Sequence, residues 1–124
     1  GRSLYRLQLQ VAAAAAPPTA SMVSQELIEG VQDMQIFYGE DTNGDRIVDR
    51  YVDANAVADW ANVLSVRVNL LLVSLENNLA NAAQTILFPA DTGGAGTVGN
   101  SFAAGDRRIY QTFTTTIGIR NRLP

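Results

Sequence analysis

Three stretches of the chain alternate largely between hydrophobic and polar residues, at 3–11, 63–74 and 107–120. A period of two over such lengths is typical of a β-strand with one buried face. The stretch 63–74 has the clearest pattern, because every second residue from Leu64 to Leu72 is apolar. We therefore expect a chain built mainly from antiparallel β-strands.

Weaker patterns predict the elements between these strands. Further short strands are expected at 34–38, 47–52 and 85–88. A short helix or turn is expected at 24–30, and a second short helix at 54–60. Asp53 is a suitable N-cap for this second helix, and Trp60 is expected on its buried side. The remaining segments are an Ala- and Pro-rich spacer at 12–23 and a Gly-rich loop at 75–105.

The predicted strands present an apolar sheet face that no predicted helix is long enough to cover. Such a face is stable only when another layer packs on it. Either the strands fold into a sandwich, or the covering helix lies in a part of the protein outside this sequence. The sequence starts almost immediately inside a strand, which favours the second solution. We expect one α+β domain over 1–124, predominantly antiparallel sheet, with its covering helix missing.

The composition excludes several classes of function. The 124 residues include 9 Arg and 12 acidic residues, a formal net charge of −3, and no Lys, His or Cys. The chain therefore lacks a thiol nucleophile, a Ser-His-Asp triad, an ordinary zinc site and a Schiff-base lysine. Its acidic balance argues against a nucleic-acid surface, and no apolar stretch approaches the ~20 residues that span a bilayer. We expect neither an enzyme nor a nucleic-acid-binding protein.

The segment 41–49 has the residue spacing of a calcium-binding loop. Oxygen-bearing side chains stand at relative positions 1, 3, 5 and 9, and a main-chain carbonyl is available at position 7. The predicted ligands are Asp41, Asn43, Asp45, Asp49 and the carbonyl of Ile47. Ca²⁺ takes about six to eight oxygen ligands, which a tight loop can bring round one point. The spacing therefore predicts Ca²⁺ as a cofactor.

Two features of this segment depart from the EF-hand pattern. Gly44 stands at position 4 instead of 6, and Val52 occupies position 12, where a bidentate Glu belongs. In the alternative interpretation, Asn43 and Gly44 form a hairpin turn between the strands at 34–38 and 47–52, and the carboxylates are solvated. Both interpretations stay open, because a hairpin tip can also hold an ion.

Two further motifs lie in the Gly-rich loop. Asp91-Thr92-Gly93 is similar to the aspartic-protease signature, and residues 94–99 match the G-x-G-x-x-G pattern of nucleotide-binding loops. The Asp follows Pro-Ala rather than an apolar strand, and no suitably spaced companion motif is present. The second motif lacks a convincing strand before it and a helix of useful length after it. We interpret both as parts of a Gly-rich loop.

Six runs of residues follow one another in a distinctive order. They are ELIEGVQDMQIFYG at 26–39, DTNGD at 41–45, RYVD at 50–53, WANVLSVRVNLLL at 60–72, Arg107-Arg108, and FTTTIGIRNR at 113–122. In this order they resemble the C-terminal half of PilW-type minor pilins of type IV pili. The LIEGV element and the RN ending are also similar to the minor pseudopilins of type II secretion. We take 24–74 and 106–122 as the core that is similar to the family.

The resemblance implies a pilin-like fold, in which a long N-terminal helix lies across an antiparallel sheet. In that family the first half of the helix sits in the inner membrane before assembly and in the fibre core afterwards. This agrees with the apolar sheet face that the strand pattern leaves without a cover. The globular domain is expected to lack this helix, and to contact a membrane only through the missing segment.

The resemblance further implies a structural subunit without catalysis, which helps to prime type IV pilus assembly and forms part of the pilus tip complex. The expected partners are other minor pilins and a tip adhesin, with roles in cell adhesion and twitching motility. The expected location is the inner membrane and periplasm before assembly, and the extracellular pilus afterwards. Two alternatives stay open: a minor pseudopilin of a type II secretion system, and a calcium-binding β-module of an extracellular adhesin.

Overall fold

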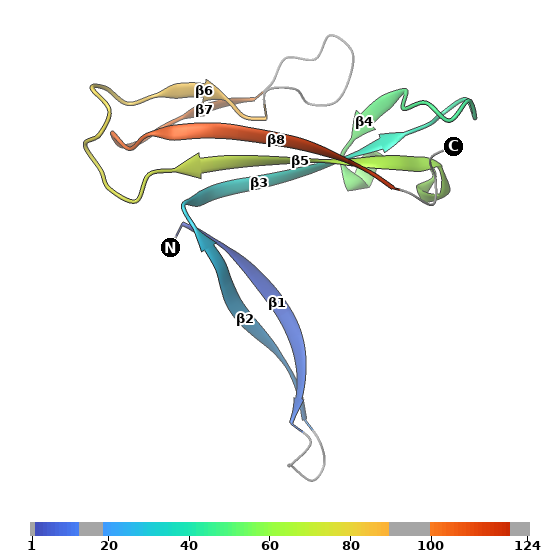
Figure 1. Ribbon diagram of the computed structural model, residues 1–124, viewed down its shortest axis with the longest axis horizontal. Coiled ribbons are helices and arrows are strands. Elements are labelled where there is room, and N and C mark those ends of the chain that lie inside the picture. The colour runs from blue at the N-terminus through green and yellow to red at the C-terminus, as the bar shows by residue number, and fades with distance from the viewer. Residues whose placement is uncertain (1, 13–18, 90–99, 120–124) are drawn as a thin grey trace.

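The computed structural model describes residues 2–12, 19–89 and 100–119, which consist mainly of antiparallel β-strands (Figure 1). The strands are β1 (Ser3–Ala12), β2 (Thr19–Glu29), β3 (Val31–Glu40), β4 (Arg50–Val52), β5 (Val63–Val73), β6 (Thr85–Leu87), β7 (Ser101–Ala103) and β8 (Tyr110–Gly118). The helical elements of this described part are two 3-10 turns, η1 (Ala54–Ala56) and η2 (Trp60–Asn62). The structure is therefore β-rich, and the α+β class expected from the sequence is not confirmed.

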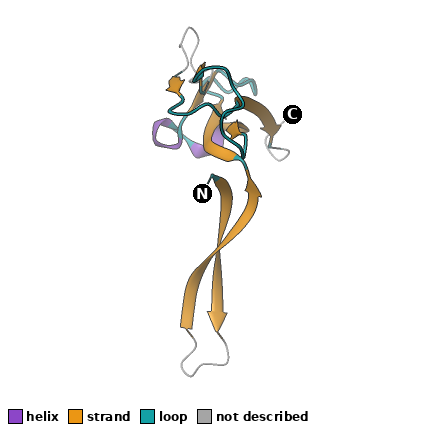
Figure 2. Ribbon diagram, turned by 90° about the vertical axis from the view of Figure 1, so that its left-hand side faces the viewer, coloured by secondary structure: helices purple, strands orange, loops and turns teal. Residues whose placement is uncertain are grey.

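Strands β1 and β2 form a separate two-stranded hairpin, here called the arm, which projects away from the other strands (Figures 1 and 2). They pair antiparallel from Ser3 opposite Glu29 to the far end of the hairpin, with one bulge after Leu4. One face of the arm carries an exposed apolar stripe of Tyr5, Leu7, Leu9, Val11 and Met22. The strand predicted at 3–11 is confirmed, but it lies in the arm and not in the central sheet.

The second strand of the arm corrects two expectations. The spacer expected at 12–23 and the helix or turn expected at 24–30 are wrong where the structure describes them, because 19–29 forms β2. Pairing with β1 supplies backbone hydrogen bonds along the whole strand, whereas a helix interrupted by Gly30 would be too short to be stable. Residues 13–18 lie outside the described residues.

The arm is joined to the central sheet at Gly30. The Arg2 carbonyl accepts hydrogen bonds from the N–H groups of Gly30 at 2.8 Å and Val31 at 3.2 Å, and the Gly30 carbonyl accepts one from the Val73 N–H at 2.9 Å. Gly30 has a φ of +80°, and a Cβ here would lie 3.0 Å from the Val73 carbonyl oxygen. Only glycine adopts this conformation without strain in so little space.

The central sheet has the strand order β4-β3-β5-β8. β5 pairs along most of its length with β3 on one side and with β8 on the other. The strands predicted at 34–38, 63–74 and 107–120 are confirmed, although β3 is longer than expected and β8 shorter. The strand predicted at 47–52 is reduced to its last three residues, because a loop occupies 41–49.

The helix predicted at 54–60 is replaced by the two 3-10 turns. Asp53 caps η1 as expected, since its side chain accepts a hydrogen bond from the Ala56 N–H. Asp59 caps η2 in the same manner, by accepting from the Ala61 N–H. No helix runs through this segment, because Val57 and Asp59 have extended backbone and the N–H groups of Ala58 and Asp59 donate to the Glu40 carboxylate.

One face of the central sheet is covered by the hairpin of β6 and β7. Leu71 is fully buried there, and it forms the core together with Val73, Tyr110 and Phe88. Phe102 of β7 places its ring 5.1 Å from the Tyr110 ring. The strand predicted at 85–88 is confirmed, whereas β7 was not predicted within the Gly-rich loop.

The same face is tightly packed at its other end, around Gly39. The Tyr51 hydroxyl and the Ser65 hydroxyl share a hydrogen bond of 3.0 Å, and the Arg67 guanidinium lies 3.7 Å from the centre of the Tyr51 ring. A Cβ on Gly39 would overlap the Ser65 hydroxyl oxygen and lie 3.0 Å from atoms of Tyr51 and Val48. Glycine is needed at this position because there is no room for a side chain.

We predict that Gly39→Ala lowers the free energy of unfolding by about 1–3 kcal/mol, because the added methyl group must displace this packing. Urea unfolding followed by the fluorescence of Trp60 measures the change. Gly105→Ala is the matched control, since nothing lies within 4 Å of a Cβ there. Equal stability of the two variants would contradict the prediction.

Candidate functional site

The face of the central sheet opposite the β6–β7 hairpin is lined with apolar side chains, and we call it the open face. The register of β3, β5 and β8 aligns these side chains in rows across the strands. The apolar residues of the open face include Met34, Ile36, Tyr38, Val66, Val68, Leu70, Phe113 and Ile117, and the polar Thr115 lies among them opposite Val68. It arises directly from the alternation of apolar residues that the sequence shows in these strands.

The side chains of the open face are in contact with solvent. Met34, Phe113 and Ile117 are 41, 51 and 55% exposed, and the five others are half-buried. Monomeric soluble proteins rarely expose a contiguous apolar patch of this kind, and such patches mark surfaces that bind another layer. The open face is therefore the strongest candidate for a functional surface in the described part of the chain.

Trp60 extends this surface at one end. Its ring packs edge-on against Tyr38, with the ring centres 4.8 Å apart, and 53% of the residue remains exposed. The expectation that Trp60 is buried under a helix is wrong, because the helix is replaced here by the 3-10 turn η2, which contains no buried residue and is followed directly by β5. An exposed aromatic ring next to an apolar face adds to the area that a partner can bury.

The predicted calcium-binding segment forms the loop between β3 and β4. Asp41, at its start, is buried, and both of its carboxylate oxygens accept backbone hydrogen bonds. The donors are the N–H groups of Asn43 at 3.1 Å, Gly44 at 2.7 Å and Arg46 at 2.9 Å. Burial raises the pKa of Asp41, but these N–H groups outweigh it and hold the pKa below its ordinary value.

The other predicted ligands also form hydrogen bonds within this loop. Asn43 Oδ1 accepts from the Asp45 N–H at 2.9 Å, and Asp45 Oδ1 accepts from the Ile47 N–H at 2.8 Å. Asp49 accepts from the backbone and the hydroxyl of Thr42 and from the Asn43 amide. No group of three or more acidic, His or Cys side chains in the described ranges is arranged to hold a metal ion. Calcium binding at this loop stays a prediction.

The alternative of a simple turn at Asn43-Gly44 needs correction. β3 and β4 do form an antiparallel pair, with Glu40 opposite Arg50, but nine residues connect them. Gly44 has a φ of +83° and Arg46 a φ of +67°. Arg46 stands at position 6 of the calcium-loop pattern, where EF-hands place a glycine for their sharp turn. The backbone therefore has a left-handed residue at position 6 of the pattern, although that residue is not glycine.

Glu40 was missed by the sequence analysis, although it holds this end of the sheet together. It is 1% exposed, and its Oε2 accepts from Nε and Nη2 of Arg50 at 3.0 and 2.7 Å. Its Oε1 accepts from the N–H groups of Ala58 at 3.0 Å and Asp59 at 2.8 Å. The opposite charges of Glu40 and Arg50 across the predicted hairpin were the signal in the sequence that could have revealed this contact.

Four hydrogen-bond donors around the Glu40 carboxylate lower its pKa. The Asp59 N–H and the Arg50 guanidinium hold the pKa of the carboxyl below its ordinary value of 4.5, against the opposing effect of burial. The folded state therefore gains stability from the ionised carboxylate above pH 4.5, and loses it as the pH falls through the folded pKa.

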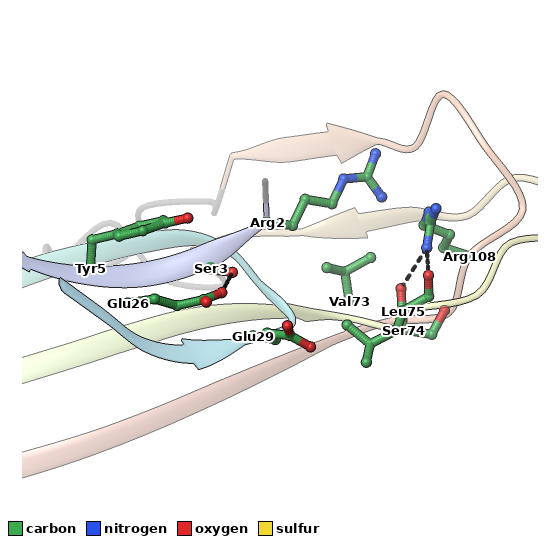
Figure 3. A pocket seen from close by; sticks show the side chains of 9 residues that line it. All are labelled: Arg2, Ser3, Tyr5, Glu26, Glu29, Val73, Ser74, Leu75 and Arg108. Atoms are coloured by element: carbon green, nitrogen blue, oxygen red, sulfur yellow. Dashed lines mark hydrogen bonds between the residues drawn. The ribbon is translucent and has the colours of Figure 1, made fainter. Parts of the chain in front are cut away.

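A pocket of about 460 Å³ lies where the arm meets the sheet (Figure 3). Most of its charged groups are engaged within the chain. Arg108 donates to the carbonyls of Ser74 and Leu75, and Glu26 accepts from the Ser3 hydroxyl at 2.5 Å. These contacts stabilise the joint of the arm, so we assign the pocket a structural role.

Asp106 is the main ionic contact of this joint. It pairs at 3.1 Å with Arg2, the residue before β1, and accepts a hydrogen bond of 2.9 Å from the Tyr110 hydroxyl. Burial raises the pKa of Asp106, but the hydrogen bonds from Tyr110, Arg108 and Arg2 hold it below its ordinary value. The base of the arm is thereby linked to the covered core of the sheet.

We predict that Glu40→Gln lowers Tm by about 5–10 °C at pH 7, because the Arg50 guanidinium loses its charged partner. The difference from wild type shrinks below pH 4.5, where the wild-type carboxylate is itself neutralised. Thermal unfolding between pH 3 and pH 8 measures both effects. Glu76→Gln is the control, since this residue is exposed, and its Tm should follow wild type at every pH. A difference that is independent of pH would contradict the electrostatic explanation.

Of the comparisons with known proteins, the one with protein families agrees with the resemblance noted in the sequence. No curated protein and no solved structure matches the chain. The motif at 91–93 and the one at 94–99 lie outside the described residues, and no described helix is long and apolar enough to cross a membrane.

The model of the PilW family, type IV pilus-assembly protein W, matches residues 2–121. The chain therefore belongs to the PilW family, whose role in type IV pilus assembly is structural and associates it with the cell envelope.

Proposed function

We propose that this chain is the globular part of a minor pilin, which helps to prime type IV pilus assembly and takes a place in the pilus tip complex. Its partners are other minor pilins and a tip adhesin, through which it serves adhesion and twitching motility. It is held at the inner membrane before assembly and in the extracellular pilus afterwards. Family membership supports the assembly role, and the open face supports the structural mechanism.

The open face is the observation that carries this proposal. A face with apolar side chains on three adjacent strands needs a second apolar layer, and in a pilin-like fold that layer is a long helix. Fully burying one large apolar side chain contributes about 1.5–3 kcal/mol, so covering the whole face is strongly favourable. The helix then sets the position of the domain in the fibre, and no catalytic group is needed.

A matched pair of lysine substitutions on β3 tests this mechanism. Met34 lies on the open face and Gln35 on the opposite face, and both side chains are exposed in the described structure. We expect Met34→Lys to reduce the number of pili per cell at least about tenfold, because assembly must bury an unpaired charge. Gln35→Lys should leave piliation near wild type. Electron microscopy of cells that carry each variant in place of the wild-type gene measures the effect.

The purified variants provide the control for folding, since both positions are solvent-exposed and both Tm values should stay close to wild type. Normal piliation with Met34→Lys would overturn the mechanism. Loss of type II secretion without loss of pili, in the same strains, would favour the alternative of a minor pseudopilin.

We also propose that the loop at 41–49 binds Ca²⁺ through Asp41, Asn43, Asp45, Asp49 and the Ile47 carbonyl. The left-handed backbone at Arg46 and the side-chain turns of Asp41, Asn43 and Asp45 support this proposal. Asp49 would have to turn from Thr42 toward the ion. In the reading as an extracellular calcium-binding β-module, this loop would be the functional centre; in a pilin it would stabilise the β3–β4 connection.

We predict that 5 mM Ca²⁺ stabilises the chain by about 1–2 kcal/mol relative to a chelator, as expected for a Kd near 10⁻³–10⁻⁴ M. Asp45→Asn should lose this response, and Asp33→Asn, a change outside the loop, should keep it. Arg46→Gly should raise stability by about 1 kcal/mol with and without Ca²⁺, because glycine adopts the φ of +67° without strain. Thermal unfolding of the four proteins measures these differences, and an unchanged wild-type Tm would remove the metal proposal.

A further inference from the structure

The two edges of the central sheet differ in how they are protected. The edge strand β4 has only three residues, Arg50–Val52, and short or charged edge strands resist pairing with other chains. The opposite edge strand β8 has nine residues, YQTFTTTIG, without a charge or a proline. It pairs with β5 without a bulge. β8 therefore lacks the short length, charge, proline and bulge that protect many edge strands.

The register shows which backbone groups of β8 face away from β5. Ile119 donates to the Leu64 carbonyl at 2.9 Å and Ser74 donates to the Ile109 carbonyl at 2.9 Å, so the odd-numbered residues of β8 are bonded to β5. The even-numbered residues point their N–H and C=O groups away from the sheet. The Tyr110 N–H confirms this direction, because it donates to the Gln84 side chain at 2.7 Å.

The outward groups of Thr112, Thr114 and Thr116 make no backbone hydrogen bond to another described residue. These three residues are exposed and are placed symmetrically about Thr114. A second copy of β8, antiparallel to the first, sets Thr114 opposite its own counterpart and Thr112 opposite Thr116. All three are then hydrogen-bonded pairs, so the outward groups of both strands find partners in the same register.

The side chains are compatible with this pairing. Cross-strand threonine pairs are favourable, and a strand without charge places no like charges opposite each other. The two-fold axis of an antiparallel pair stands perpendicular to the sheet, so both open faces end on the same side. The two four-stranded sheets then form one continuous sheet. A helix layer on the open faces does not block this pairing, because it leaves the β8 edge accessible.

We propose that two copies of this chain associate through their β8 edges, with Thr114 on the two-fold axis. Two nine-residue strands joined edge to edge bury less than the about 1,200 Å² of a standard stable interface. The dimer is therefore weak and reversible in solution, and becomes populated where two chains are held close together. This association goes beyond the minor-pilin proposal and does not depend on the helix that covers the open face.

Single cysteines on β8 test the register, because the chain contains no cysteine of its own. In the proposed dimer the two Cα atoms at position 114 are about 5.5 Å apart, which suits a disulfide. The two Cα atoms at position 112 are about 14 Å apart, because they are offset by four residues along the strands and lie on different strands, and this is too far for a bond. We expect Thr114→Cys to form a disulfide dimer at least about tenfold faster than Thr112→Cys under mild oxidation.

An equimolar mixture of Thr112→Cys and Thr116→Cys should also cross-link rapidly, although neither variant does so alone. The mixture keeps the Thr114 hydroxyl, which donates to Asn69 at 2.8 Å, so the result does not depend on the folding of Thr114→Cys. Equal cross-linking rates for all three single variants, or no faster reaction of Thr114→Cys and the mixture, would overturn the proposal. Since purified protein is used, the outcome is independent of whether the chain supports piliation.

Discussion

The packing of the β6–β7 hairpin on one face of the central sheet is the contact on which the rest of the structure depends. It buries Leu71 completely and encloses Tyr110, whose hydroxyl donates to Asp106. Asp106 in turn pairs with Arg2, so the arm is joined to the sheet through the same core. Among the described residues this hairpin is the layer that packs on the sheet, and it covers one face. The apolar residues of the open face therefore stay in solvent.

The far end of the sheet contains buried carboxylates in addition to buried apolar side chains such as Val63 and Leu64. Glu40 and Asp41 are adjacent and nearly inaccessible, and both are surrounded by N–H donors. Burying two neighbouring negative charges would be costly without such donors. Here the donors come from the 3-10 turns and from the loop itself, which explains why both pKa values lie below their ordinary range. A calcium ion, if the loop binds one, would act on a segment that already has a defined conformation.

Strand patterns in the sequence predicted much of the fold, because they act over short distances. The alternation from Leu64 to Leu72 identified β5, and the same rule identified β1 and β8. The partner of β1 could not be predicted, since β2 has weak alternation and its pairing depends on contacts across a hairpin whose tip lies outside the described residues. Trp60 was misplaced for a similar reason. The position of its ring depends on where η2 ends. That point is set by tertiary contacts, and a helical pattern in the sequence does not predict it.

Three surfaces of this chain are left without partners among the described residues, and they differ in chemistry. The open face offers apolar area, β8 offers backbone hydrogen bonds, and the arm offers a narrow apolar stripe on a two-stranded ribbon. A hairpin of two strands is marginally stable on its own in water. Each surface is more stable when something binds it, and anything that binds only the folded chain raises its stability by mass action. In the proposed minor-pilin role the stability of the chain would therefore be coupled to assembly, because a partner that covers any of these surfaces would also stabilise the fold.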